Sequence, residues 1–313
     1  MIMRDERPAG RGLGDRQAVR LGQVKSDWSR AGVADAAEGL GELAGLLDGW
    51  RADPEWTARA ATERARWDAY IDGLRAPDAE APTYAQVVGV INEASGPDDY
   101  VMTASGGLPG ELIGGWRAVS TPGAPTMDVE YGFSCMGYEL AGAWGAAMAR
   151  PTGVVTTLLG DGSYLMLNSE LFSAAFAGTG FVAVVCDNDG YAVIDRLQRG
   201  QGGAAFNNMY ADCRSTHAEP PRVDFAAHAA ALGCAVLPAD GIAALRAGYA
   251  KAREHARAGR PAVVVIRTRP SAWTEAGAWW EVGVPEVSAR PEINAARNAL
   301  EEAKARQVRY LAR

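Results

Sequence analysis

Short apolar runs alternate with helical patterns through most of the chain. Runs rich in Val, Ile and other apolar residues predict strands at Tyr100–Ala104, Gly153–Leu159, Phe181–Cys186, Cys234–Leu237 and Ala262–Thr268. Apolar positions at three- and four-residue steps predict helices near Tyr84–Ala94, Gly137–Ala149, Asn168–Ala177, Asp224–Leu232 and Ile242–Ala258. Strands this apolar, joined by helical crossovers, are typical of a parallel sheet. We therefore expect an α/β fold, a doubly wound parallel sheet with helices on both faces.

The two ends of the chain have a different pattern. Residues 1–30 mix arginines, acidic residues and glycines, which predicts a flexible arm. Helical spacing from Val33 to Leu47, and again from Pro54 to about Leu74, predicts a short helical segment, and a linker then ends at Pro82. A charged helix is expected over Glu292–Leu311. The expected organisation is an arm (1–30), a helical segment with its linker (31–80), the sheet domain (81–290) and a C-terminal helix (291–313).

Composition narrows the class of protein. The chain has 313 residues, 48% of them hydrophobic, which is ample for a large core. No apolar run approaches the roughly 18–20 residues of a membrane span, and the first residues lack the apolar core of a secretory signal. A net charge of −7 without a basic stripe argues against a nucleic-acid surface. The four scattered cysteines lack metal-ligand spacing, so we expect reduced thiols, a cytoplasmic location and a small-molecule ligand.

Two acidic turns follow two of the predicted strands. Gly160-Asp-Gly-Ser163 comes directly after one strand and Asp187-Asn-Asp-Gly190 directly after the next, about one strand–helix–strand crossover further along. In parallel sheets, ligands bind at the carboxyl ends of the strands. Magnesium prefers oxygen ligands and usually retains phosphate oxygens and water among them. The pattern therefore predicts a metal–diphosphate site with Asp161, Asn188 and the Gly190 carbonyl as ligands.

Simpler explanations exist for each turn alone. Gly-Asp-Gly and Asn-Asp-Gly are common wherever a turn needs positive φ, and only their combination at two strand ends favours a site. The Asp187 turn is a poor calcium-loop match, because its glycine comes too early. The Gly160 turn is followed by neither the lysine of a P-loop nor the third glycine of a dinucleotide fingerprint.

Gly160-Asp-Gly162 followed by Asn188 resembles the thiamine-diphosphate signature of the acetolactate synthase and pyruvate decarboxylase superfamily, in its diphosphate-binding domain. The resemblance covers about Trp50 to Arg290 and is strongest to the trihydroxycyclohexane-dione hydrolase family of inositol catabolism. The segments that carry it are Ala104-Ser-Gly-Gly-Leu-Pro-Gly110, Glu130-Tyr-Gly-Phe-Ser-Cys-Met-Gly137, Gly162-Ser-Tyr-Leu-Met-Leu-Asn168-Ser-Glu170, Asp195-Arg-Leu-Gln198, Phe206-Asn-Asn208 and Trp279-Trp280.

This resemblance implies thiamine diphosphate and Mg²⁺ as cofactors. It implies that Asp161, Asn188 and the Gly190 carbonyl hold the metal. The residues implied in cofactor binding are Gly106, Gly107, Leu108, Ser134, Cys135, Met136, Gly160, Gly162, Ser163 and Tyr191. Met136 stands where the superfamily places the apolar residue that bends the cofactor, and Ser134 would offer its carbonyl to the aminopyrimidine amino group. A core methionine is the simpler alternative for Met136.

The chain departs from the superfamily pattern before the linker. Relatives carry an activating glutamate on a separate pyrimidine-binding domain, and the roughly 80 residues before the linker are too few for that domain. Those residues resemble the last helices of a middle domain. We therefore expect a partner subunit that carries the pyrimidine-binding domain and its glutamate, in an α2β2 assembly. The alternative is a non-catalytic or regulatory protein that binds the cofactor without turnover.

The expected reaction cleaves or forms a C–C bond next to a carbonyl group of a 2-keto acid or 1,2-dione. Carboligation and hydrolytic opening of a cyclic dione both remain open. Ile194 stands where pyruvate decarboxylases have a catalytic glutamate, which makes simple decarboxylation the weaker option. Met136, Asp195 and His217 are the candidate catalytic residues. His217 lies in a glycine-containing loop, Arg199–Pro220, that we expect to act as a lid, although an ordinary loop histidine is the simpler alternative.

Overall fold

The computed structural model describes residues 2–3, 33–77, 81–119, 124–213, 221–274 and 281–306. Contacts divide the chain into two units, residues 65–300 and residues 1–64 with 301–313. The first of these units contains the sheet and all of the candidate site. The predicted N-terminal arm, His217 and the Trp279-Trp280 pair lie outside the described residues, apart from the backbone of two residues near the N-terminus.

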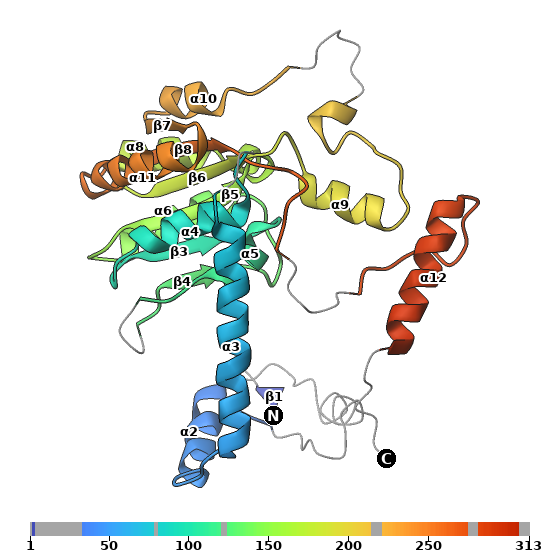
Figure 1. Ribbon diagram of the computed structural model, residues 1–313. Helices are drawn as coiled ribbons and strands as arrows, with labels where there is room; N and C mark the ends of the chain where they lie inside the picture. Colours follow the sequence, from blue (N-terminus) through green and yellow to red (C-terminus); the bar gives the residue numbers. More distant parts are fainter. Residues whose placement is uncertain are drawn as a thin grey trace, which may run out of the picture. The chain divides into compact units, whose positions relative to one another are not determined.

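A six-stranded sheet forms the centre of the unit of residues 65–300 (Figure 1). Its strands are β3 (Tyr100–Thr103), β4 (Met127–Val129), β5 (Val155–Gly160), β6 (Val182–Asp187), β7 (Ala235–Ala239) and β8 (Ala262–Arg267). They are all parallel, in the order β4-β3-β5-β6-β8-β7. The predicted parallel α/β sheet is confirmed, and β4 is an edge strand that the sequence pattern did not reveal.

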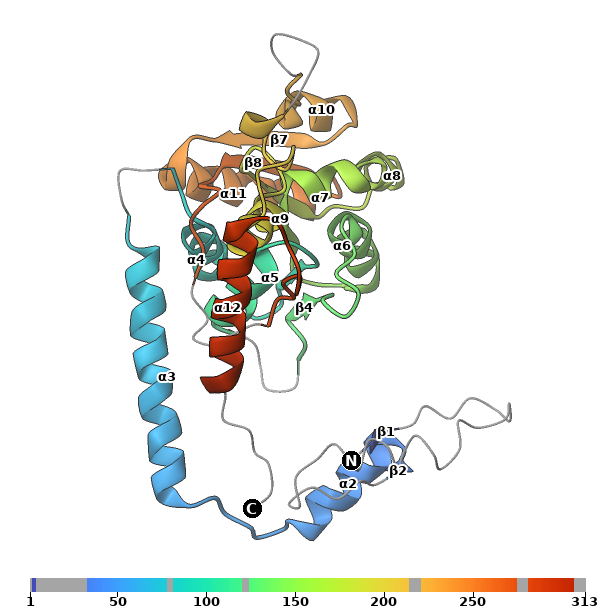
Figure 2. The ribbon, with the colours of Figure 1, turned by 90° about the vertical axis from the view of Figure 1, so that its right-hand side faces the viewer.

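Helices cover both faces of this sheet (Figure 2). One face packs on α4 (Tyr84–Ala94), α5 (Leu108–Gly115) and α11 (Gly241–Arg257). The other packs on α6 (Tyr138–Ala149), α7 (Asp161–Met166), α8 (Ser169–Ala177) and α10 (Phe225–Ala231). Along β6, Val182 and Val184 lie in the first core, whereas Ala183 and Val185 lie in the second. This two-residue alternation is why a continuous apolar run fits a strand buried on both sides.

The register of the sheet brings the two acidic turns together. Gly160, the last residue of β5, pairs with Cys186 near the end of β6. The strand order also reverses at β3 and β5, because β4 extends the sheet in one direction and β6 in the other. A crevice outside the carboxyl ends of the strands at such a reversal is the usual ligand site of this architecture.

Four more helices are described, and the boundaries between the two units fall within two of them, α3 (Pro54–Arg75) and α12 (Pro291–Arg306). The other two are α2 (Ala36–Leu46) and α9 (Ala192–Gly200), and a two-residue pairing joins β1 (Ile2–Met3) to β2 (Val33–Ala34). The later part of α3 lies against the end of α5, where Trp67 Nε1 donates to the Gly114 carbonyl at 2.6 Å. Within the described residues, no helix is both long and apolar enough to cross a membrane.

Candidate cofactor and metal site

A cavity of about 420 Å³ opens at the carboxyl ends of β3, β5 and β6. The loops after these three strands supply most of its wall. The residues of the sequence prediction that line it are Gly106, Gly107, Leu108, Ser134, Met136, Gly160, Asp161, Gly162, Ser163, Asn188, Gly190 and Tyr191. The fold therefore brings together residues that lie up to 85 positions apart in the chain, although their individual roles stay predictions.

Asp161 lies at the start of α7 and is buried. Its Oδ1 accepts from the Gly162 N–H at 3.0 Å and its Oδ2 accepts from the Gly190 N–H at 2.8 Å. The second bond joins the turn after β5 to the turn after β6. Burial, and to a smaller degree the nearby Asp187, raises the pKa of Asp161 to about 7, although the two N–H donors act in the opposite direction. A cation would compensate this buried carboxylate.

Asn188 is equally buried, and the two ends of its amide have different surroundings. Nδ2 donates to the Tyr84 hydroxyl at 2.7 Å, whereas Oδ1 is buried without a hydrogen-bond partner. A buried amide oxygen without a partner costs free energy, of the order of 1–3 kcal/mol, so its presence requires an explanation. A cation ligated by Oδ1 would satisfy it.

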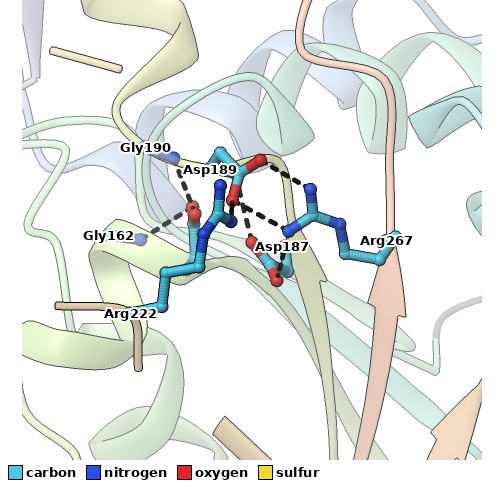
Figure 3. Close-up of polar contacts among 7 residues, drawn as sticks. Gly162, Asp187, Asp189, Gly190, Arg222 and Arg267 are labelled. Carbon is cyan, nitrogen blue, oxygen red and sulfur yellow. Dashed lines mark hydrogen bonds and ion pairs between the residues drawn. The ribbon is translucent and has the colours of Figure 1, made fainter. Parts of the chain in front are cut away.

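Charged side chains hold the loop that carries Asn188 and Gly190 (Figure 3). Arg267, at the end of β8, binds both Asp187 and Asp189, with Nη1 at 3.0 Å and 2.8 Å from one oxygen of each. Arg222 binds Asp189 from the opposite side, and its guanidinium lies 3.7 Å from the centre of the Tyr210 ring. The Arg267 contacts lower the pKa of Asp189. Asp189 is therefore neutralised within the loop, which leaves Asp161 as the buried carboxylate at the cavity.

Close approach explains several glycines of the cavity wall. A Cβ atom on Gly162 would lie 2.5 Å from Tyr191 Cε1, and one on Gly107 would lie 3.0 Å from Tyr84 Cε2. Gly190 has φ 143°, and its Cβ would lie 2.3 Å from the Asn208 carbonyl oxygen. Side chains at these positions would displace the walls, so the glycines keep backbone atoms at the cavity surface.

Glu139 ties the surrounding loops to one another. This side chain of α6 is fully buried, and it accepts from the Gly137 N–H at 2.8 Å and the Ser105 N–H at 3.2 Å. The Ser105 hydroxyl lies 3.1 Å from the hydroxyl of Ser163, which lines the cavity. One carboxylate thus connects the loop after β3, the start of α6 and the start of α7.

The mouth of the cavity differs from its base, because large apolar side chains there are exposed. Met136 and Tyr131 line the cavity and are 37% and 50% exposed. Phe133, in the same loop, is 90% exposed, and Met166 at the end of α7 is 51% exposed. Ser134, between Phe133 and Met136 in the chain, has φ 53°, an uncommon value for a residue other than glycine. Met136 therefore lies at the cavity rather than in the core.

Two predicted residues lie away from the cavity. The carboxylate of Asp195 accepts from Arg199 Nε with both oxygens, at 2.9 Å and 2.7 Å, and Arg199 also binds Asp212. Cys135 is exposed, its backbone N–H donates to Glu130, and its carbonyl accepts from the Tyr138 N–H at 3.2 Å. The geometry thus gives Asp195 a part in holding α9 to the segment after it. The i,i+4 spacing of Asp195 and Arg199 is a signal in the sequence for this pair.

The described residues fit a metal bound to a diphosphate. In those parts of the chain, no three His, Cys, Asp or Glu side chains converge, so a cation would combine Asp161 with amide, carbonyl and phosphate oxygens. That donor set suits Mg²⁺, which usually takes one or two carboxylates together with substrate phosphates. The unpartnered Asn188 Oδ1 and the glycine-lined wall next to it agree with this chemistry.

Comparison with known proteins defines the class. Residues 114–266 match the family described as thiamine pyrophosphate enzyme, C-terminal TPP binding domain. The chain therefore belongs to the thiamine pyrophosphate enzymes through this domain, whose cofactor is thiamine diphosphate with a divalent cation such as Mg²⁺. A solved benzoylformate decarboxylase from Polynucleobacter necessarius shares the fold, with a TM-score of 0.52 and 18% identity over 62% of this chain and 34% of that one.

Among individual proteins, the chain is similar to 3D-(3,5/4)-trihydroxycyclohexane-1,2-dione hydrolases. The protein from Halalkalibacterium halodurans is 31% identical over 292 residues, which are 93% of this chain and 42% of that protein. The protein from Bacillus subtilis is 30% identical and is matched over 86% of this chain and 45% of its own length. This chain thus spans less than half the length of these relatives. The activity of the full-length relatives is therefore not assigned to this chain by similarity alone.

Sequence reasoning missed three residues that shape the site: Tyr84, Ser105 and Glu139. Tyr84 and Ser105 line the cavity, and Glu139 supports it from behind. A lone carboxylate inside the apolar stretch of α6 is a signal that could have identified Glu139. Tyr84 carries no such signal, because 104 positions separate it from Asn188 in the chain.

Proposed function

We propose that this chain supplies the diphosphate- and metal-binding half of a thiamine-diphosphate active site, in an enzyme that cleaves a C–C bond next to a carbonyl group. The proposed reaction is the hydrolytic opening of a cyclic 1,2-dione. The observation that carries the proposal is the convergence of Asp161, Asn188 and Gly190 at one end of a glycine-lined cavity, with Asn188 Oδ1 buried and unpartnered.

The residues of the chain have separate tasks at this site. Asp161, Asn188 Oδ1 and the Gly190 carbonyl would hold the cation, and the backbone at Gly106, Gly107 and Gly162 would accommodate the diphosphate. When bound, thiamine diphosphate supplies a nucleophilic carbon for the carbonyl group and accepts the electron pair of the neighbouring C–C bond. Met136 would hold the bound molecule in its bent shape from the mouth of the cavity. The chain therefore contributes positioning and electrostatics.

Hydrolysis of a dione is the favoured reaction because the similar proteins carry the name of a cyclic dione hydrolase. Cleavage between two carbonyl carbons by water is balanced, since water provides OH to the carbon that becomes the acid and H to the carbon that becomes the aldehyde. Ile194 lines the cavity and offers no acidic group there. Carboligation of 2-keto acids is the second candidate, and its observable difference is the release of CO₂.

We further propose that a separate polypeptide supplies the pyrimidine-binding domain and the activating glutamate. Among the described residues that line the cavity, Asp161 is the single carboxylate, and it lies at the metal end. The mouth carries exposed apolar side chains, which are Tyr131 and Met136 on the cavity wall and Phe133 in the same loop. Clustered exposed apolar groups of this kind mark surfaces that another protein covers.

Co-purification of the full chain with a candidate pyrimidine-domain polypeptide tests these proposals. We expect the pair to retain thiamine diphosphate and to convert a cyclic 1,2-dione into equal amounts of carboxylic acid and aldehyde groups without CO₂. CO₂ release from pyruvate, with no dione opening, would favour carboligation instead. A complex that retains the cofactor but turns over neither substrate would favour a non-catalytic role. Absence of cofactor binding in the chain and in the complex would contradict the proposed site.

A further inference from the structure

Tyr84 occupies a central place beneath the metal end of the cavity. It is the first residue of α4, whose start is fixed by reciprocal hydrogen bonds between Thr83 and Gln86. The side chain is 8% exposed, and its hydroxyl lies 2.7 Å from Asn188 Nδ2. A Cβ atom on Gly107, on the loop after β3, would lie 3.0 Å from its ring atom Cε2. A well-fixed helix end thus places one hydroxyl against a metal ligand from another element.

The Tyr84 hydroxyl pairs with the nitrogen end of the Asn188 amide, and the oxygen end has no protein partner. The two ends have almost the same shape, so neighbouring hydrogen bonds determine which one faces a ligand. Only the oxygen can ligate a cation. When the Tyr84 oxygen accepts the Nδ2 proton, Oδ1 is left without a protein partner, as the structure shows. Without that hydroxyl, Nδ2 would be a buried donor with no partner in the orientation that binds the metal.

The chemistry of Tyr84 suits this task, because a tyrosine hydroxyl is ordinarily neutral near pH 7. A neutral hydroxyl accepts from Nδ2 without bringing a competing negative charge next to the cation.

We propose that Tyr84 is a positioning residue for the metal, acting by orienting the amide of Asn188 so that Oδ1 ligates the cation. This inference rests on the proposed thiamine-diphosphate site, because it assigns a role toward the same cation. It adds a residue that takes no direct part in ligation.

The test measures metal binding by the full chain directly. Mn²⁺ serves as the probe in the presence of thiamine diphosphate, and electron paramagnetic resonance reports the free ion. We expect Tyr84→Phe to weaken Mn²⁺ binding by about 10- to 100-fold, as for other residues that orient metal ligands. The matched control is Tyr249→Phe, because Tyr249 is also buried and its hydroxyl lies 2.8 Å from Thr156 on the α11 side of the sheet. That control should leave Mn²⁺ affinity unchanged.

A second background separates orientation from packing. A carboxylate presents an oxygen whichever way it turns, so Asn188→Asp removes the need for orientation. In that background, Tyr84→Phe should weaken Mn²⁺ binding much less than in the parent chain. An equal loss in both backgrounds would show that Tyr84 acts through packing, and would overturn the proposal.

Two further outcomes are distinguishable. If the parent chain binds Mn²⁺ in a cofactor-dependent manner and Tyr84→Phe binds it equally well, the role of Tyr84 is refuted while the proposed function stands. If the parent chain, alone and with its partner, shows no such binding, both proposals fail together.

Discussion

The base of the cavity is buried and hydrogen-bonded, whereas its mouth is exposed and apolar. At the base, Asp161 and Asn188 are buried, and hydrogen bonds to Gly162, Gly190 and Tyr84 determine their positions. At the mouth, Phe133 and Met136 project from a loop and are exposed. The base needs only a ligand to be complete, whereas the mouth exposes apolar surface to water. This difference agrees with the proposals that the base holds the metal and the diphosphate and that a partner polypeptide covers the mouth.

Among the variants that test this difference between base and mouth, the largest loss of cofactor binding is expected for a change at Asp161. The isosteric change Asp161→Asn removes the charge and turns an amide group toward the Gly162 or Gly190 N–H donors. We expect thiamine-diphosphate binding in the presence of Mg²⁺ to weaken by at least about 100-fold, measured by isothermal titration calorimetry. Asp98→Asn, at an exposed position, is the control and should bind normally. Unchanged cofactor affinity in Asp161→Asn would remove this carboxylate from the site.

The backbone of the base is tested by Gly190→Ala. The added Cβ would meet the Asn208 carbonyl oxygen at 2.3 Å, and φ at this residue is 143°. The loop must shift, so we expect the free energy of unfolding to fall by about 1–3 kcal/mol and Mg²⁺-dependent cofactor binding to weaken with it. Urea denaturation measures the first effect. Gly145→Ala in α6, where a Cβ meets nothing within 4 Å, should leave both quantities unchanged or raise stability slightly.

Glu139→Gln tests whether the base depends on support from behind. The carboxylate accepts from both the Gly137 and Ser105 N–H groups, and a glutamine would turn an amide N–H toward one of these donors. We expect a loss of about 1–3 kcal/mol in unfolding free energy. Cofactor affinity should fall as well, because Ser105 contacts Ser163. Glu254→Gln, an exposed change on α11, is the control. A variant as stable as the parent chain would show that the loops hold without this carboxylate.

The same contrast explains what the sequence could predict. Strands β5 and β6 were predictable because continuous apolar runs and crossover spacing are local patterns. The acidic turns at their ends predicted the metal site, and the structure brings these turns together at one cavity. In contrast, β4 has three residues, and α5 is a short helix that contains several glycines, which disfavour a helix. These elements form because the sheet edge pairs β4 and because Leu108 and Leu112 are buried. Because tertiary contacts determine these two elements, the local sequence pattern could not predict them.

Among the site residues, those in compact motifs were predictable and those that act across the fold were not. Gly160 to Ser163 lie together in the sequence, whereas the contact of Tyr84 with Asn188 depends on the complete sheet. The predicted catalytic role of Asp195 had no support from spacing, and its carboxylate is engaged by Arg199. His217 lies outside the described residues, and its role stays a prediction.

The smallest effect on the chain itself, and the sharpest test of the mouth, is expected for Phe133→Ala. Phe133 is 90% exposed, so we expect its loss to change the unfolding free energy by less than about 0.5 kcal/mol. Phe225→Ala removes the same side chain at a site that is 7% exposed and packs on Tyr164, and it should cost about 3–5 kcal/mol.

For binding of the proposed partner, we expect the larger effect from Phe133→Ala and the smaller one from Phe225→Ala. Calorimetry of the two polypeptides measures this binding. Loss of an exposed aromatic anchor typically weakens an interface by about 1–2 kcal/mol, so Phe133→Ala should weaken association about 10-fold. Phe225→Ala, at a temperature where it stays folded, should leave association unchanged. If Phe133→Ala instead destabilises the chain as much as Phe225→Ala does, Phe133 packs within the chain. The mouth would then be a closed surface like the base, and the contrast between the two ends of the cavity would no longer require a partner.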